Sequence, residues 1–125
     1  MFGLLQELQK NFHLYSQVII KEGEGEAKPT SYDEVSVHYV GRFLDGTEFD
    51  SSRTQNKLLT LKLDDNRMIK GWDICVATMK AGEICRLVCS PEHGYGKKGQ
   101  PPKIPGDALL VFEIELVSWH GKICL

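Results

Sequence analysis

The alternation of apolar and polar residues along the chain predicts a protein built mainly of β-strands. In residues 34–43, Val35, Val37 and Tyr39 alternate with polar residues. A period of two residues is typical of a strand that buries one of its faces. Further alternating or short apolar segments predict strands over residues 15–21, 47–49, 59–63, 83–90 and 109–119.

One internal segment, residues 69–79, has the spacing of a helix instead. Trp72, Val76 and Met79 stand at positions i, i+4 and i+7, which places them on one side of a helix. Gly82 follows shortly afterwards and favours termination of the helix. Many strands with one short helix, and no regular alternation of strands with helices, predict an α+β fold. In this fold an antiparallel sheet packs one face on the helix.

The two ends of the chain are predicted to flank a single globular domain. The length of 125 residues is typical of one domain. We assign residues 17–119 to this domain, residues 1–16 to an N-terminal extension, and residues 120–125 to a tail or the start of a linker. Four apolar side chains of the extension have helical spacing, namely Leu4, Leu5, Leu8 and Phe12. They favour either a short amphipathic helix, which would pack on the domain or on a partner, or a frayed terminus.

Charge and composition exclude several classes of function. The 15 Lys and Arg residues against 17 Asp and Glu residues give a formal charge of −2, so there is no strongly basic surface for nucleic acid. No apolar run approaches the ~20 residues that a membrane-spanning helix needs. The first residues also lack the basic and apolar segments of a secretory signal. We therefore expect a protein of the reducing cytoplasm or the nucleus, with unpaired cysteines.

Two motifs suggest a cofactor site or a metal site, but the residues around each motif argue against it. Residues 94–99 match the pattern G-x-G-x-x-G, but the prolines that follow exclude the helix that a dinucleotide site requires. Cys85 and Cys89 lie on a predicted strand and are therefore about 13 Å apart, too far for the usual pair of zinc ligands. We expect both thiols to lie with Leu87 on the buried face of that strand. The sequence therefore predicts neither a metal nor a cofactor.

Aromatic residues near strand ends and loops indicate a binding site. Phe49 directly precedes Asp50 at the end of a predicted strand, and Tyr95 lies in a segment rich in glycine and proline. A large amphipathic side chain in such a loop more often binds a ligand than packs in the core. These residues belong to a series of longer motifs, which include Asp45-Gly46-Thr47-Glu48-Phe49-Asp50-Ser51-Ser52, Met68-Ile69-Lys70-Gly71-Trp72, Ser90-Pro91-Glu92-His93-Gly94-Tyr95-Gly96 and Pro101-Pro102-Lys103-Ile104-Pro105.

These motifs follow one another in the order found in a known family. The chain resembles the FKBP-type peptidyl-prolyl cis-trans isomerases, the immunophilins that bind tacrolimus and rapamycin. It is most similar to the first domain of the large, multidomain cytosolic members. The resemblance implies a five-stranded antiparallel half-barrel wrapped around one short α-helix. It implies proline-containing peptides or proteins as partners, tacrolimus or rapamycin as ligands, and a chaperone partner bound through domains outside this chain.

The resemblance also implies a role for individual residues. Trp72 is expected to form the floor of a prolyl pocket, with walls from Tyr39, Phe49 and Phe112. The carboxylate of Asp50, the hydroxyl of Tyr95 and the backbone N–H of Ile69 are expected to act on the carbonyl groups of the peptide. The remaining pocket residues are expected to be Leu59, Met68 and Ile104.

The chemistry of proline isomerisation suits these residue types. Rotation about an amide bond costs ~18–20 kcal/mol because the planar amide loses its resonance. A dry aromatic pocket disfavours the charge-separated planar form, and donors placed for the twisted amide stabilise it over the ground state. No covalent intermediate is needed for this reaction.

Two pocket positions depart from the pattern of the family. Leu59 stands where an aromatic wall is usual, and Gln55 stands where an arginine usually pairs with the Asp50 position. We expect the first change to remove aromatic contact and the second to leave Asp50 with weaker charge compensation. Reduced isomerase activity is therefore expected, and a binding module with little or no turnover, as part of a co-chaperone, is the alternative.

Overall fold

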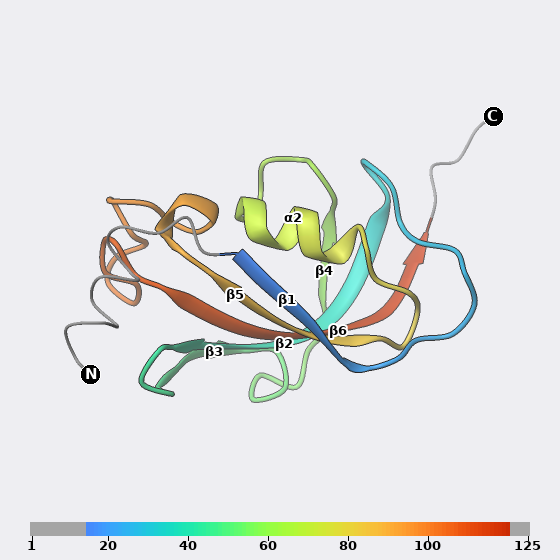
Figure 1. The fold of residues 1–125 in the computed structure, drawn as a ribbon, viewed down its shortest axis with the longest axis horizontal. Coiled ribbons are helices and arrows are strands. Elements are labelled where there is room, and N and C mark those ends of the chain that lie inside the picture. Colours follow the sequence, from blue (N-terminus) through green and yellow to red (C-terminus); the bar gives the residue numbers. More distant parts are fainter. Residues whose placement is uncertain (1–14, 121–125) are drawn as a thin grey trace.

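Six strands form one antiparallel sheet in the computed structural model, which describes residues 15–120 (Figure 1). The sheet has the order β1-β5-β6-β2-β3, and β4 pairs with β2 as well. The strands span β1 Tyr15–Lys21, β2 Glu34–Phe43, β3 Glu48–Ser51, β4 Leu59–Lys62, β5 Ile84–Cys89 and β6 Leu110–His120. The predicted α+β fold with an antiparallel sheet is confirmed. The apolar segment of residues 4–12, expected to form either a short helix or a frayed terminus, lies outside the described residues. The division of the chain into three segments stays a prediction.

The edge of the sheet beside β2 is shared by two short strands. β3 pairs with residues 40–42 of β2, whereas β4 pairs with residues 34–37 of the same strand. The six strands therefore occupy five positions across the sheet, which is the width that the family resemblance implied. On its other side β2 pairs with β6 from Glu34↔His120 to Phe43↔Leu110, and this long pairing forms the centre of the sheet.

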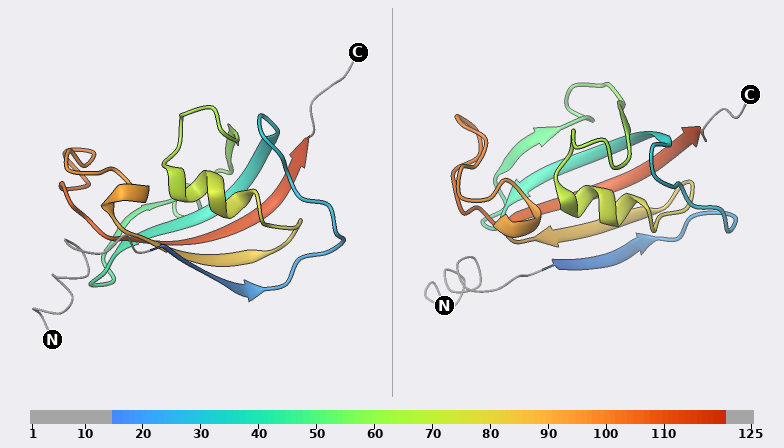
Figure 2. Two further views of the ribbon diagram at one scale, coloured as in Figure 1. Left: turned by 45° about the horizontal axis from the view of Figure 1, so that its top comes forward. Right: turned by 90° about the horizontal axis from the view of Figure 1, so that it is seen from above.

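The sheet curves around the single described α-helix, α2 Lys70–Val76, as the two views of Figure 2 show. The helix ends earlier than residue 79, where the apolar spacing predicted its end. The N–H groups of Thr78 and Met79 bond to the carbonyls three residues before them, Cys75 and Val76, so the last turn is tighter than an α-helix. Met79 nevertheless stays fully buried, because the tightened turn keeps its side chain on the sheet side.

No helix within residues 15–120 is both long and apolar enough to cross a membrane. The only other described helix is a 3₁₀ turn, Pro91–His93, which leads from β5 into the loop of residues 94–106. That loop contains turns and one isolated bridge but no helix. The G-x-G-x-x-G match at residues 94–99 therefore lacks the helix of a dinucleotide site, as the prolines predicted.

Three free cysteines are buried between the helix and the sheet. Cys75 lies on α2, whereas Cys85 and Cys89 lie on β5 and share its buried face with Leu87. The prediction for β5 is thus confirmed. Burial raises the pKa of the Cys89 thiol to about 12. Burial, and then the S–H bond to the Glu83 carboxylate, raise that of Cys85 to about 12.

We expect Cys75, Cys85 and Cys89 to react slowly with a thiol reagent in the folded protein at pH 7.5. The attacking species is the thiolate, and burial keeps these thiols protonated and shielded. Labelling by iodoacetamide, followed per site by mass spectrometry, should proceed at least about tenfold more slowly than in the same protein unfolded in urea. Rapid labelling of Cys85 or Cys89 without unfolding would contradict their placement in the core.

Candidate active site

Aromatic rings from four elements meet at the amino-terminal end of α2. Trp72 of α2 is 1% exposed, and its ring contacts Tyr39 of β2 and Phe112 of β6, with centroids 5.2 and 5.4 Å away. Phe112 in turn contacts Phe49 of β3 at 5.7 Å. These three contacts are edge-to-face, the arrangement that aromatic pairs prefer. The structure therefore brings together the four rings that were expected to form the floor and walls of a pocket.

A glycine in the middle of β2 makes room for two of these rings. A Cβ atom on Gly41 would lie 2.7 Å from Phe49 Cζ, closer than real side chains approach, and 3.0 Å from Phe112 Cε1. Gly41 pairs with Asp50 on one side and with Phe112 on the other. Sequence reasoning missed this role, although a glycine inside a strand often marks a close approach of neighbouring groups.

The Asp50 carboxylate is held by three neutral donors. The Tyr39 hydroxyl donates to Oδ2 at 2.6 Å, while the Gln55 amide and the Ser51 backbone N–H donate to Oδ1 at 2.8 and 2.9 Å. Gln55 therefore keeps a hydrogen bond to Asp50 but supplies no positive charge. Within residues 15–120, no lysine or arginine forms an ion pair with this carboxylate.

The chain beyond Asp50 is fastened to β2 beside Tyr39. The Ser52 N–H donates to the Tyr39 carbonyl at 3.0 Å, and the Tyr39 N–H donates to Ser52 Oγ at 2.7 Å. Ser52 is 2% exposed, so water does not compete for these bonds. Local backbone pairing thus fixes Tyr39 and Asp50 relative to each other.

Both tyrosines of the site are kept in the protonated form. Burial, and then the hydrogen bond to Asp50, raise the pKa of Tyr39. Burial, and then the negative charge of Asp50, raise the pKa of Tyr95. The ordinary pKa of tyrosine is already near 10. Both hydroxyl groups are therefore hydrogen-bond donors at neutral pH.

The loop of residues 94–106 closes one side of the site. A cavity of about 330 Å³ is lined by Phe49, Asp50, Tyr95 and residues 100–104 of this loop. The loop is held by paired backbone bonds between Gln100 and Ile104, at 2.8 and 3.0 Å. Ile104 is 4% exposed and thus forms part of the buried wall. Two expected residues of the site, Tyr95 and Ile104, are brought to Phe49 and Asp50 in this way.

Ile69 stands at the amino-terminal end of α2, directly before the helix. Its carbonyl accepts the N–H groups of Trp72 and Asp73 at 3.1 and 3.4 Å. Its own N–H makes no hydrogen bond to another residue in the described part of the chain, which leaves a backbone donor available next to the aromatic floor. Leu59 and Met68 are half-buried and pack against the same core, which includes Trp72.

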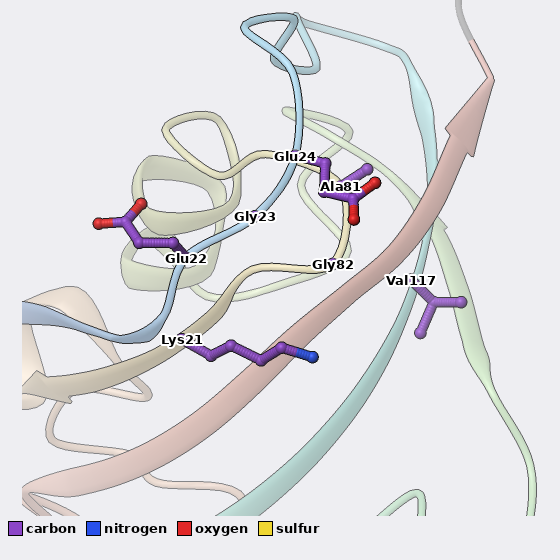
Figure 3. Close-up of a pocket in the computed structure, with 7 residues that line it drawn as sticks. All are labelled: Lys21, Glu22, Gly23, Glu24, Ala81, Gly82 and Val117. Carbon is purple, nitrogen blue, oxygen red and sulfur yellow. The ribbon is translucent and has the colours of Figure 1, made fainter.

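A second hollow, at the opposite end of the sheet, has no comparable chemistry. This cavity of about 320 Å³ is lined by Lys21–Glu24, Ala81, Gly82 and Val117 (Figure 3). The side chains of Lys21 and Glu22 extend in different directions in Figure 3, and two of the seven lining residues, Gly23 and Gly82, have no side chain. Across residues 15–120, no group of three His, Cys, Asp or Glu side chains could hold a metal ion.

Comparison with known proteins places residues 25–117, which include the candidate active site, in a family. The family described as FKBP-type peptidyl-prolyl cis-trans isomerase matches residues 25–117. The chain is 50% identical over 106 residues to peptidyl-prolyl cis-trans isomerase FKBP4 of Mus musculus, covering 85% of this chain and 23% of that protein. It is 50% identical to FK506-binding protein 59 of Drosophila melanogaster, covering 83% of this chain and 24% of that protein. It is 43% identical to FK506-binding protein 1A of Emericella nidulans, covering 79% of this chain and 92% of that protein. The chain thus spans about a quarter of the length of the first two relatives.

Proposed function

Because the chain belongs to the FKBP-type peptidyl-prolyl cis-trans isomerase family, we propose that this domain catalyses the cis–trans isomerisation of X–Pro bonds in peptides and proteins. The observation that carries the proposal is the hydrogen bond between Tyr39 and Asp50 beside the buried ring of Trp72. This hydrogen bond fixes the Asp50 carboxylate next to the apolar ring of Trp72. Catalysis of rotation about a prolyl amide uses both a fixed polar group and an apolar surface.

In the proposed pose the prolyl ring lies on Trp72 between the rings of Tyr39, Phe49 and Phe112. The carbonyl of residue X lies beside Asp50 and the Tyr95 hydroxyl, and a second peptide carbonyl accepts the Ile69 N–H. The apolar surroundings remove water from the amide and disfavour its planar, charge-separated form. Fixed dipoles that fit the twisted amide lower the barrier, and each ~1.4 kcal/mol gained raises the rate tenfold.

The proposed activity is tested by measuring the cis-to-trans rate of a short Ala-Leu-Pro-Phe peptide, together with a titration of tacrolimus. We expect acceleration of the peptide that tacrolimus inhibits. Tacrolimus binding without acceleration would favour a binding module with little turnover. The neutral partner of Asp50, Gln55, is the specific observation in favour of that second candidate. Absence of both effects would contradict the proposed function.

The proposed function also includes a protein partner other than the prolyl peptide. The longer relatives extend well past the matched region, so a chaperone partner would bind through parts outside this chain. We also propose a reducing compartment, the cytosol or the nucleus, because three buried cysteines remain free thiols.

The double substitution Leu59→Phe and Gln55→Arg is expected to raise isomerase activity and tacrolimus affinity. A phenylalanine at position 59 adds aromatic contact, and an arginine at position 55 replaces a neutral donor to Asp50 with a charged one. An aromatic contact contributes about 0.5–1.5 kcal/mol, so we expect a gain of roughly two- to tenfold in kcat/KM. The two single variants show which change acts. Unchanged activity in the double variant would contradict this account of both positions.

A further inference from the structure

Strand β1 forms an outer edge of the sheet. It pairs with β5 on one side, from Tyr15↔Cys89 to Lys21↔Ile84, and it is the last strand on its other side (Figure 2). No backbone group of residues 15–21 bonds to a described residue outside this pairing. Alternate N–H and C=O groups of β1 therefore point outwards without a partner in residues 15–120. Such an edge is the surface to which a further strand can be added.

The same edge exposes three consecutive apolar side chains. Val18, Ile19 and Ile20 are each about half exposed. The pairing with β5 shifts between Ile19 and Lys21, which leaves Ile20 as an extra residue in the strand. A bulge of this kind often protects an edge strand, but here it adds a third exposed apolar residue. A run of three exposed apolar residues is unfavourable in water unless it takes part in binding.

We propose that β1 is a self-association edge, which pairs antiparallel with β1 of a second copy of this chain about a two-fold axis at Ile19. In this register Val18 faces Ile20 of the second copy, and Ile19 faces its own equivalent. Each exposed apolar side chain thus meets another apolar side chain, and the outward backbone groups of both strands gain partners.

The residues that flank the apolar run favour a second copy in this register. Gln17 faces Lys21 of the second copy, and Ser16 faces Glu22, so no like charges are opposed. A slip of one residue in either direction would instead oppose an apolar residue to Gln17 or Lys21. An isologous dimer uses one surface patch twice, and this strand is complementary to itself in that sense.

The proposed interface leaves the candidate active site open. β1 and β3 stand at opposite ends of the strand order β1-β5-β6-β2-β3, and Phe49 and Asp50 belong to β3. A peptide at the site would therefore not compete with the second copy. One pair of short strands buries less than the roughly 1,200 Å² of a stable interface, so we expect a weak dimer with a dissociation constant on the order of 100 μM.

The test measures the mass of the full chain by sedimentation equilibrium, from about 10 μM to about 1 mM, with a reducing agent present. We expect monomers at the lowest concentration and dimers at the highest. Ile19→Lys should raise the dissociation constant at least about tenfold, because two ammonium groups then face each other across the axis. Ile74→Lys is the matched control, since Ile74 of α2 is 46% exposed and Ile19 is 47% exposed. It should leave the dissociation constant unchanged.

A mixture of two variants tests the two-fold register itself. Ile19→Lys and Ile19→Glu should each associate poorly alone, because like charges face each other. An equal mixture should associate at least about tenfold more tightly than either variant alone, since opposite charges then meet across the axis. Association of the mixture also shows that both variants are folded.

Each outcome decides the proposal. A monomer at every concentration overturns it, and slow amide hydrogen exchange along β1 of that monomer would indicate that another part of the chain covers the edge. A dimer that Ile19→Lys leaves unchanged, or that Ile74→Lys weakens as much, also overturns it. A mixture that associates no better than either variant alone overturns the pairing about Ile19. None of these results changes the proposed isomerase function, which is measured separately on the prolyl peptide.

Discussion

The Trp72→Ala protein is expected to lose tacrolimus binding and about 3–5 kcal/mol of its free energy of unfolding. The indole is 1% exposed and contacts the rings of Tyr39 and Phe112. Its removal leaves a cavity between the helix and the sheet, and the same cavity replaces the floor on which a prolyl ring would lie. Urea denaturation gives the stability, and a tacrolimus titration at a temperature where the variant remains folded gives the binding.

A matched substitution on the same helix separates the two roles of the tryptophan. Ile74 is 46% exposed, so Ile74→Ala should change the free energy of unfolding by less than about 1 kcal/mol and leave tacrolimus binding unaltered. A Trp72→Ala protein that remained as stable as Ile74→Ala and still bound tacrolimus normally would show that the ring is neither floor nor core.

The second large effect is expected from Gly99→Ala, through the loop of residues 94–106. Gly99 has a φ of +66°, and a Cβ there would lie 2.4 Å from the Ile104 carbonyl oxygen. The Gly99 N–H also donates to the Tyr95 carbonyl at 3.1 Å. The backbone must therefore move apart, which displaces both Tyr95 and Ile104 from the site. We expect kcat/KM for a prolyl peptide to fall at least about tenfold.

Gly96→Ala is the control for this prediction. Gly96 also has a positive φ, +62°, but no atom lies within 4 Å of the position of its Cβ. Its substitution should bring only the backbone strain of an alanine, about 1–2 kcal/mol. Equal losses of activity in the two variants would mean that strain, and not the contact with residue 104, controls the loop.

The elements could be predicted from the sequence because they depend on residue type and local spacing, whereas the grouping of the four aromatic rings was implied by the family resemblance. Alternation located β2 and β6, and helical spacing located Trp72 and Met79 on one buried face. The apolar spacing predicted that α2 ends at residue 79, whereas the helix ends at Val76. The tightened turn that follows depends on hydrogen bonds that the apolar pattern does not encode.

The details around Asp50 depend on neighbours that the sequence does not reveal. The division of one sheet edge between β3 and β4 depends on where β2 finds its partners. The bond from Gln55 to Asp50 depends on how the chain turns after β3. The family resemblance indicated a missing charge at position 55 but not the retained hydrogen bond. Gly41 offered only the general signal of a glycine within a strand.

The central pairing of β2 with β6 has a consequence for the order in which the candidate site forms. β6 is the last described strand, and it contributes Phe112 to the aromatic cluster while its partner β2 contributes Tyr39. Contacts between such distant parts of a chain form slowly, because loop closure must come before the pairing stabilises it. On a ribosome, the segment up to β5 therefore has neither the central strand of the sheet nor one wall of the site. The aromatic cluster is therefore complete only after residues 110–120 have left the exit tunnel.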